Sequence, residues 1–271
     1  MEQKKTSSSS FFSRGYLLLI LLFIYLPIVY LMVFSFNESK SQTNFSAFSL
    51  KWYENMFNDR TMLESIKYTV LVAVIATVVS TVIGTVTAIG LSKAKPLVRT
   101  VVLEVNNLPV MNPDIVTAIG MMLLFLLSGV DQSLLTLIIA HITFCIPYVI
   151  LTVMPKLRQL DDNVAEAAMD LGANPWQALT KVIIPQIYPA IFSGALIAFS
   201  MSFDDFVISF FTAGKGINNI SMYVYASFRR YNPSLNAMST LIVVVVTIIL
   251  VLVNLIPHIR DKKAKREDPE T

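Results

Sequence analysis

The sequence is poor in charge and in the residues that carry most catalytic and metal chemistry. Of its 271 residues only 14% are charged, against roughly 25% in an ordinary soluble domain. It has two histidines and one cysteine, Cys145, so it has no intrachain disulfide framework. His141 and Cys145 are four residues apart, but two ligands do not make a zinc site. We therefore expect a hydrogen-bonded histidine inside a helix bundle, no metal, and no catalytic residues.

A nucleotide-binding loop is also missing from the sequence. The phosphate-loop pattern G-x-x-x-x-G-K-[ST] does not occur, and its nearest match, Gly214-Lys215-Gly216, lacks the remaining residues. We therefore predict no enzyme activity for this chain, and any ATP-driven step would need a separate subunit.

Long hydrophobic runs are what the sequence has in excess. Hydrophobic residues make up 55% of the chain and gather into runs that reach the roughly 20 residues needed to cross a bilayer as a helix. The sequence predicts an all-α, polytopic membrane protein with six transmembrane helices, at about 16–36, 64–91, 101–127, 132–154, 190–211 and 237–257.

The positions of the cations predict the orientation. With six spans, both termini lie on one side of the membrane, and that side holds 14 of the 21 Lys and Arg residues. Because cytoplasmic loops are enriched in Lys and Arg, both termini are predicted to be cytoplasmic. The net charge of +3 then needs no nucleic-acid partner. The cations counted are Lys4, Lys5, Arg14, Lys93, Lys95, Arg99, Lys156, Arg158, Lys181, Arg260, Lys262, Lys263, Lys265 and Arg266.

The first span and the tails have simple interpretations. The run from 16 to 36 is too long for the core of a signal peptide and no cleavage site follows it, so we expect an uncleaved helix. The Ser-rich, charged residues 1–14 predict a disordered tail. Trp52 and Tyr53 suit a membrane interface.

One predicted span has a stripe of small residues. Ser80, Gly84 and Ala88 are four residues apart, a pattern that lets membrane helices pack closely. The functional alternative is that they line a pore.

A polar island at residues 161–185 separates two apolar spans on the cytoplasmic side. Asp161 or Asp162 is suited to cap a helix, and Gly172 to end it in the left-handed conformation. Asn174-Pro175 begins a second helix, which Pro185 is expected to stop. The island either covers the helix bundle or docks a partner. The small side chains of Ala165, Ala167 and Ala168 favour docking.

This island resembles the EAA loop of permease subunits from ABC importers. The resemblance is carried by Glu166-Ala167-Ala168, by Gly172 and by the ending Val182-x-Ile184-Pro185. Val182 and Ile184 stand where the family pattern has Ile and Leu. The resemblance implies that the loop fits a cleft on a separate subunit, which binds ATP and Mg. The coupling residues it implies are Glu166, Ala167, Ala168, Gly172 and Pro185.

The resemblance also implies a domain organisation and a fold, the type I ABC importer permease fold. A permease core of five transmembrane helices occupies about 63–258 and includes the coupling loop at 155–189. An additional transmembrane helix with an outer loop precedes it at 15–62. Cytoplasmic tails occupy 1–14 and 259–271. The expected location is the inner, or cytoplasmic, membrane of a bacterium.

Three acidic residues inside predicted spans are the strongest candidates for a substrate site. Ionisable groups within spans cost about 2.5–3.5 kcal/mol each and are functional candidates by default. Counted along their helices, Asp204 would lie about 21 Å and Asp114 about 20 Å from the cytoplasmic end. Pro109 and Pro113 are expected to break the span that carries Asp114 and to free backbone carbonyls that could also face a cation. Neither span contains a Lys or Arg within its apolar run. A cationic substrate is the simplest compensation.

The adjacent pair Asp204-Asp205 needs separate interpretation. Neighbouring residues on a helix point about 100° apart, so one carboxylate would face the substrate and the other a neighbouring helix. Asp205 is favoured for the substrate because it shares a face with Ser202 and Ser209. The alternative is that the acids form a hydrogen-bonded network that locks helices together. Phe203 and other aromatic residues near the acids are expected mainly to pack.

Within the importer family, the chain is most similar to the C-type permeases of spermidine/putrescine transporters. The similar segments are Lys51-Trp52-Tyr53, residues 113–116, residues 141–147 and Asp204-Asp205. The resemblance implies a second, homologous permease, two ATP-binding subunits and an extracytoplasmic polyamine-binding protein. It also ties substrate to Trp52, Asp114, Asp204 and Asp205, and the face shared with Asp205 adds Ser202.

Two other functions remain open from the sequence. An ABC permease for another solute would keep the coupling loop, and only the acids argue for a cation. An ion-coupled secondary transporter, in which the acids relay protons, would belong to a different class. Copurification of an ATPase subunit separates these two alternatives.

Overall fold

The computed structural model describes residues 7–161, 163–227 and 231–267. Within these ranges the chain is helical and carries no β-strand, apart from an isolated antiparallel bridge between Asn37 and Phe48. It divides into two compact units, Met1–Arg60 with Ser227–Thr271, and Thr61–Ala226.

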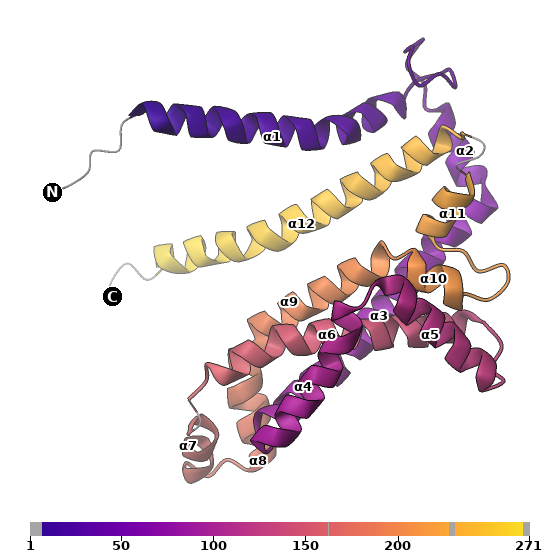
Figure 1. Cartoon of the computed structure of the whole chain (residues 1–271). Helices are drawn as coiled ribbons and strands as arrows, with labels where there is room; N and C mark the ends of the chain where they lie inside the picture. The colour runs from indigo at the N-terminus through magenta and orange to yellow at the C-terminus, as the bar shows by residue number, and fades with distance from the viewer. Residues whose placement is uncertain (1–6, 162, 228–230, 268–271) are drawn as a thin grey trace. The chain divides into compact units, whose positions relative to one another are not determined.

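The first unit contains three helices: α1 (Ser7–Phe34), α2 (Lys51–Asn58) and α12 (Ser234–Glu267), and α12 packs against the other two (Figure 1). From Tyr16 onward the apolar side chains of α1 are largely exposed, as expected for a helix that faces lipid. Residues 7–14 are helical where the sequence predicted a disordered tail, and α12 remains helical to Glu267. The outermost parts of both predicted tails lie outside the described residues.

The loop between α1 and α2 is organised by Asn37. Its Nδ2 donates to the carbonyls of Ser41 and Asn44, at 3.0 and 2.9 Å, and its Oδ1 accepts from the backbone of Ser46. Trp52 Nε1 donates to the Asn37 carbonyl over 2.6 Å, and Trp52 is only 4% exposed. The ring of Trp52 is thus buried within this unit, and its position at the membrane interface stays a prediction.

The second unit carries the candidate site. Its long helices are α3 (Arg60–Ser92) and α6 (Leu134–Arg158), with α4 (Pro96–Met111) and α5 (Asp114–Leu127) between them. The remaining helices are α7 (Val164–Asp170), α8 (Pro175–Ala178), the π-helix η1 (Leu179–Ile183), α9 (Ile184–Phe203), α10 (Val207–Thr212) and α11 (Ile220–Ser227). Helices α6 and α9 pack along each other, and α7 and α8 lie at one end of this pair (Figure 1).

Close helix packing in this unit depends on small residues. Ser80, Gly84 and Ala88 of α3 are all buried. A Cβ atom at Gly84 would lie 2.8 Å from the side chain of Val149 on α6, and one at Gly194 of α9 would lie 3.5 Å from it. The predicted packing role of the small-residue stripe is therefore confirmed.

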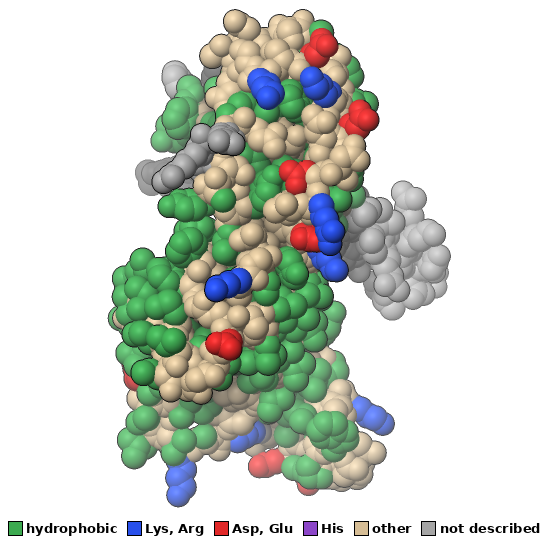
Figure 2. Space-filling model, turned by 90° about the vertical axis from the view of Figure 1, so that its right-hand side faces the viewer, with side chains coloured by type: hydrophobic (Ala, Val, Ile, Leu, Met, Phe, Trp, Pro, Cys, Tyr) green, Lys and Arg blue, Asp and Glu red, His purple; other side chains and the backbone are tan. Residues whose placement is uncertain are grey.

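Four described helices are long and apolar enough to cross a membrane: Arg14–Phe34, Arg60–Ser92, Leu134–Arg158 and Pro175–Phe203. The pair α4 and α5 adds a fifth span if counted as one, and Ser234–Ile249 is a shorter apolar helix. The predicted number of six spans is thus not confirmed. Broad patches of hydrophobic side chains are exposed on the surface, as a lipid environment requires (Figure 2).

Two predicted spans are not continuous helices. The span at 101–127 bends by 106° between α4 and α5, because Pro113 cannot donate to a helical ladder and holds Asn112 in an extended conformation. The span at 190–211 is interrupted between Phe203 and Val207. Asp114 and the adjacent pair Asp204-Asp205 therefore lie at helix breaks.

Candidate functional site

The break between α4 and α5 exposes Asp114. This residue is the first of α5, directly after Pro113, and its side chain is exposed. An acidic side chain in the first helical turn lies at the positive end of the helix dipole. The protein thus presents a carboxylate where the chain changes direction.

The break between α9 and α10 separates its two acids. Asp204 follows the last residue of α9 and is exposed, whereas the side chain of Asp205 is only 6% exposed. The two carboxylates face different surroundings, as predicted. The prediction that Asp205 faces the substrate was based on a continuous helix, which the structure does not have.

Asp205 is bound by the first turn of α10. Its Oδ1 accepts from the backbone N–H of Ile208 at 3.1 Å, and its Oδ2 accepts from the N–H and the hydroxyl of Ser209 at 2.8 and 2.9 Å. The two N–H donors are among the unsatisfied N–H groups that every helix start leaves. The carboxylate therefore caps α10.

His141 joins this carboxylate to the neighbouring helices. Its Nδ1 shares a 2.7 Å hydrogen bond with Ser202 of α9, and its Nε2 a 3.0 Å bond with Ser209. The same Nε2 lies 3.5 Å from Asp205 Oδ2. Asn219 Nδ2 donates to the Asp205 carbonyl at 2.6 Å and to Ser209 Oγ at 2.8 Å. The expectation of a hydrogen-bonded histidine is confirmed.

The network changes the interpretation of the acids. The charge of Asp205 is compensated by two backbone N–H groups and one hydroxyl, with an imidazole 3.5 Å away, so the carboxylate does not require a cationic substrate. Ser202 is buried and bound to His141. Asp204 and Asp114 remain exposed, and no ion pair joins either to a described cation.

The two breaks are held near one another by α6 and its neighbours. Helix α10 packs against both α5 and α6. Thr136 of α6 donates to the Thr212 carbonyl at 2.9 Å, and Gln132 to the Phe211 carbonyl at 2.7 Å. Along α6, Tyr148 lies within electrostatic range of Asp114, and Cys145 within that of Asp205. The two helix breaks, one carrying Asp114 and the other Asp204 and Asp205, therefore both lie beside one face of α6.

The aromatic residues near the acids pack against each other. Phe203 stacks on Phe199 with ring centroids 5.4 Å apart, and Phe206 contacts Tyr225 at 4.9 Å. Trp52 lies in the other unit. Among the described residues, no group of three His, Cys, Asp or Glu side chains is arranged to hold a metal.

The predicted coupling segment, which is the polar island at residues 161–185, has the expected form of two helices joined by a turn at Gly172. Gly172 has a φ of +89° and ends α7. The N–H of Ala173 donates to the Ala168 carbonyl at 3.1 Å, and that of Gly172 to the Met169 carbonyl at 2.9 Å. These two bonds form a Schellman motif, which satisfies the last carbonyls of the helix. This part of the prediction is confirmed.

The start of the second helix is confirmed but its end is not. The side chains of Asn174 and Gln177 form a capping box around Pro175. The helix does not stop at Pro185, which lies in the first turn of α9. The preceding residue, Ile184, donates to Leu179 five residues back. This π-helical turn accommodates the proline without ending the helix, so helical structure continues from Pro175 to Phe203.

The predicted N-cap of α7 is also wrong. Asn163 occupies that position without a side-chain cap. Asp161 instead accepts from the Asn163 N–H at 3.0 Å, outside the helix. The other candidate, Asp162, lies outside the described residues.

The coupling segment exposes a surface of mixed character. Glu166, Ala167, Gly172 and Pro185 are exposed and Ala168 is half-buried. Two large apolar side chains, Leu171 at 90% and Trp176 at 70% exposure, also project from it. Leu171 directly precedes the glycine turn, where helical periodicity no longer sets the direction of a side chain.

The chain matches the family described as "Binding-protein-dependent transport system inner membrane component" over residues 80–266. It is 34% identical over 253 residues to the spermidine/putrescine transport system permease protein PotC of Escherichia coli K12, covering 92% of this chain and 94% of that protein. It is 36% identical over 247 residues to the putrescine transport system permease protein PotI of the same strain, covering 86% of each.

A solved structure has the same fold. It is the crystal structure of a bacterial ABC transporter involved in the import of the acidic polysaccharide alginate, with a TM-score of 0.73 at 17% identity, covering 95% of this chain and 99% of the matched chain. The chain belongs to the family of inner membrane components of binding-protein-dependent transport systems. It is a multi-pass inner membrane protein and a transport permease subunit.

The different environments of the two adjacent acids predict different effects on stability. We expect Asp205→Ala to lower the free energy of unfolding by about 1–3 kcal/mol or more, because buried N–H and hydroxyl donors lose their acceptor. Asp204→Ala should change it by at most about 0.5 kcal/mol, as for an exposed site. Denaturant unfolding in detergent measures both variants. Equal effects would contradict the assigned network.

Proposed function

We propose that this chain is the permease subunit of an ATP-driven ABC importer for polyamines such as spermidine and putrescine, with both termini in the cytoplasm. The observation that carries the proposal is the pair of exposed, unpaired carboxylates, Asp204 and Asp114, at two helix breaks beside α6. The relatives named above are permeases of spermidine/putrescine and putrescine systems.

The charge of these groups supports a cationic substrate. A polyamine carries several ammonium groups, and charge-assisted hydrogen bonds to carboxylates are roughly twice as strong as neutral ones. The structural relative takes part in importing an acidic polysaccharide on the same fold. The fold therefore does not decide the substrate, and the side chains at the breaks do.

The other predicted site residues have more limited roles. Asp205 and Ser202 belong to the substrate site indirectly, because their network fixes the break from which Asp204 projects. The relation of Trp52 to substrate rests on the resemblance alone.

The proposed assembly contains a second, homologous permease, two ATP-binding subunits that bind ATP and Mg, and an extracytoplasmic polyamine-binding protein. The exposed side chains of Leu171 and Trp176 support a docked partner at the coupling segment, since large apolar groups of this kind mark interaction sites. Glu166, Ala167 and Gly172 lie on the same segment.

The proposed mechanism is alternating access. ATP binding and hydrolysis on the partner subunits move α7 and α8. Helical structure runs without a gap from Pro175 to Phe203, so this motion reaches the break at Asp204 along one rigid element. The acidic site then faces outward and inward in turn. It binds weakly, because a tight site would not release the polyamine.

Two other functions remain to be tested against this proposal. A permease for another solute would keep the coupling segment and would not depend on the two acids. An ion-coupled secondary transporter would need no ATP, and its uptake would follow the membrane potential.

Uptake of labelled spermidine tests the acidic site. We expect Asp204→Asn and Asp114→Asn each to raise the concentration for half-maximal uptake by roughly 10- to 100-fold, because each removes a charged partner of an ammonium group. Asp131→Asn, which changes an exposed acid in the loop between α5 and α6, should have no effect. Unimpaired uptake at low spermidine in both test variants would refute the acidic site.

Copurification tests the coupling segment. Leu171→Ser should reduce recovery of the ATP-hydrolysing subunits with the tagged permease by about tenfold, because burying a large apolar side chain contributes about 1.5–3 kcal/mol. Leu127→Ser, at a position 85% exposed at the end of α5, is the matched control. Full recovery with Leu171→Ser and Gly172→Pro would contradict docking at this segment.

A further inference from the structure

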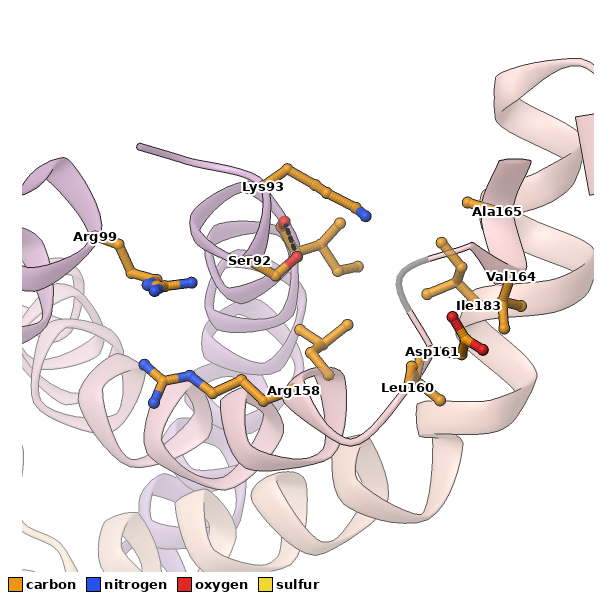
Figure 3. A pocket seen from close by; sticks show the side chains of 11 residues that line it. Ser92, Lys93, Arg99, Arg158, Leu160, Asp161, Val164, Ala165 and Ile183 are labelled. Atoms are coloured by element: carbon orange, nitrogen blue, oxygen red, sulfur yellow. Dashed lines mark hydrogen bonds between the residues drawn. The ribbon is translucent and has the colours of Figure 1, made fainter. Parts of the chain in front are cut away.

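A cavity lies between the coupling segment and the ends of the membrane helices. Its volume is about 280 Å³, close to the lower limit of roughly 300 Å³ for small-molecule pockets. It is bounded by the C-terminal ends of α3 and α6, the first turn of α4, the start of α7, and η1 (Figure 3). The lining residues that matter are Lys93, Arg99, Arg158, Asp161, Val164 and Ile183.

The polar side of this cavity is positively charged. Lys93, Arg99 and Arg158 line it with a single described carboxylate, Asp161, which leaves two net positive charges. Asp161 accepts from the backbone of Asn163, and none of the three cations forms an ion pair with a described carboxylate. The guanidinium groups of Arg99 and Arg158 turn toward one another (Figure 3).

The cations are placed at the level of the membrane surface. Lys93 directly follows the span Arg60–Ser92, and Arg158 ends the span Leu134–Arg158. Arg158 also lies in the last turn of α6, where a cation stabilises the negative end of the helix dipole. This interaction of Arg158 with the helix dipole depends on its charge and leaves most of its five guanidinium donors free. Two guanidinium groups are well suited to bidentate contacts with phosphate oxygens.

We propose that this cavity binds the phosphate-bearing headgroup of an anionic phospholipid. The lipid is placed in the cytoplasmic leaflet, and this placement rests on the proposed function. A lipid fits better than free phosphate because the rest of the lining is apolar, with Leu157, Val164 and Ile183 among its residues. A bound headgroup lies between α3, α4 and α6 on one side and α7 and η1 on the other. It therefore links the coupling segment to the membrane helices.

Lipid titration of the full-length chain, followed by native mass spectrometry, tests the proposal. Phosphatidylglycerol should bind the wild-type chain more tightly than phosphatidylcholine. Each basic residue near anionic lipid contributes about a fivefold change in affinity, so Arg99→Gln with Arg158→Gln should weaken phosphatidylglycerol binding about 25-fold. Lys95→Gln, which removes an exposed cation from the same segment outside the cavity, should change it less than about twofold.

A competition experiment distinguishes a lipid from a free phosphate compound, and a single-site variant keeps the test valid if the double variant misfolds. Soluble glycerol phosphate should not displace phosphatidylglycerol, and equal competition by it would overturn the lipid assignment. If the double variant does not fold, Lys93→Gln alone should weaken binding about fivefold. Unchanged phosphatidylglycerol binding in a folded variant would overturn the proposal. The readout uses neither polyamine nor ATP, so its failure is separate from a failure of the proposed function.

Discussion

The carboxylate of Asp205 is the group on which the arrangement of the candidate site depends. A helix that stops inside a membrane leaves N–H groups without partners, and no lipid can satisfy them. Asp205 accepts from two such groups at the start of α10, and Ser209 joins it to His141. This charge, held by donors of α10 and by the nearby His141 of α6, makes the break between α9 and α10 stable.

The stable break determines what Asp204 can do. Because Asp205 has all the partners it needs within the protein, its neighbour is left exposed with an uncompensated charge. Asp114 reaches a similar position by another route, since Pro113 bends the chain between α4 and α5. Two breaks with different causes thus present acids beside α6, while helical structure from Pro175 onward links one of them to the coupling segment.

Local signals in the sequence were sufficient for some features and not for others. Gly172, Asn174 and Pro175 predicted the turn and the second helix correctly, because each residue acts within its own few neighbours. Pro113 likewise indicated the break before Asp114. The break at Asp204 was missed, because hydrophobicity shows only that a segment lies in the membrane. The pairing of His141 with Ser202 and Ser209 joins residues distant in sequence, and Pro185 continues a helix through a π turn that no composition rule indicates.

The central claim is that Asp204 and Asp114 bind cargo while Asp205 holds the break. A structure of the assembled complex with spermidine bound tests it most directly. The account predicts spermidine ammonium groups within about 3 Å of the Asp204 and Asp114 carboxylates, the range of charge-assisted hydrogen bonds. Asp205 should keep its contacts with Ile208, Ser209 and His141. An ammonium group bound to Asp205, with Asp204 and Asp114 facing away from the substrate, would contradict it.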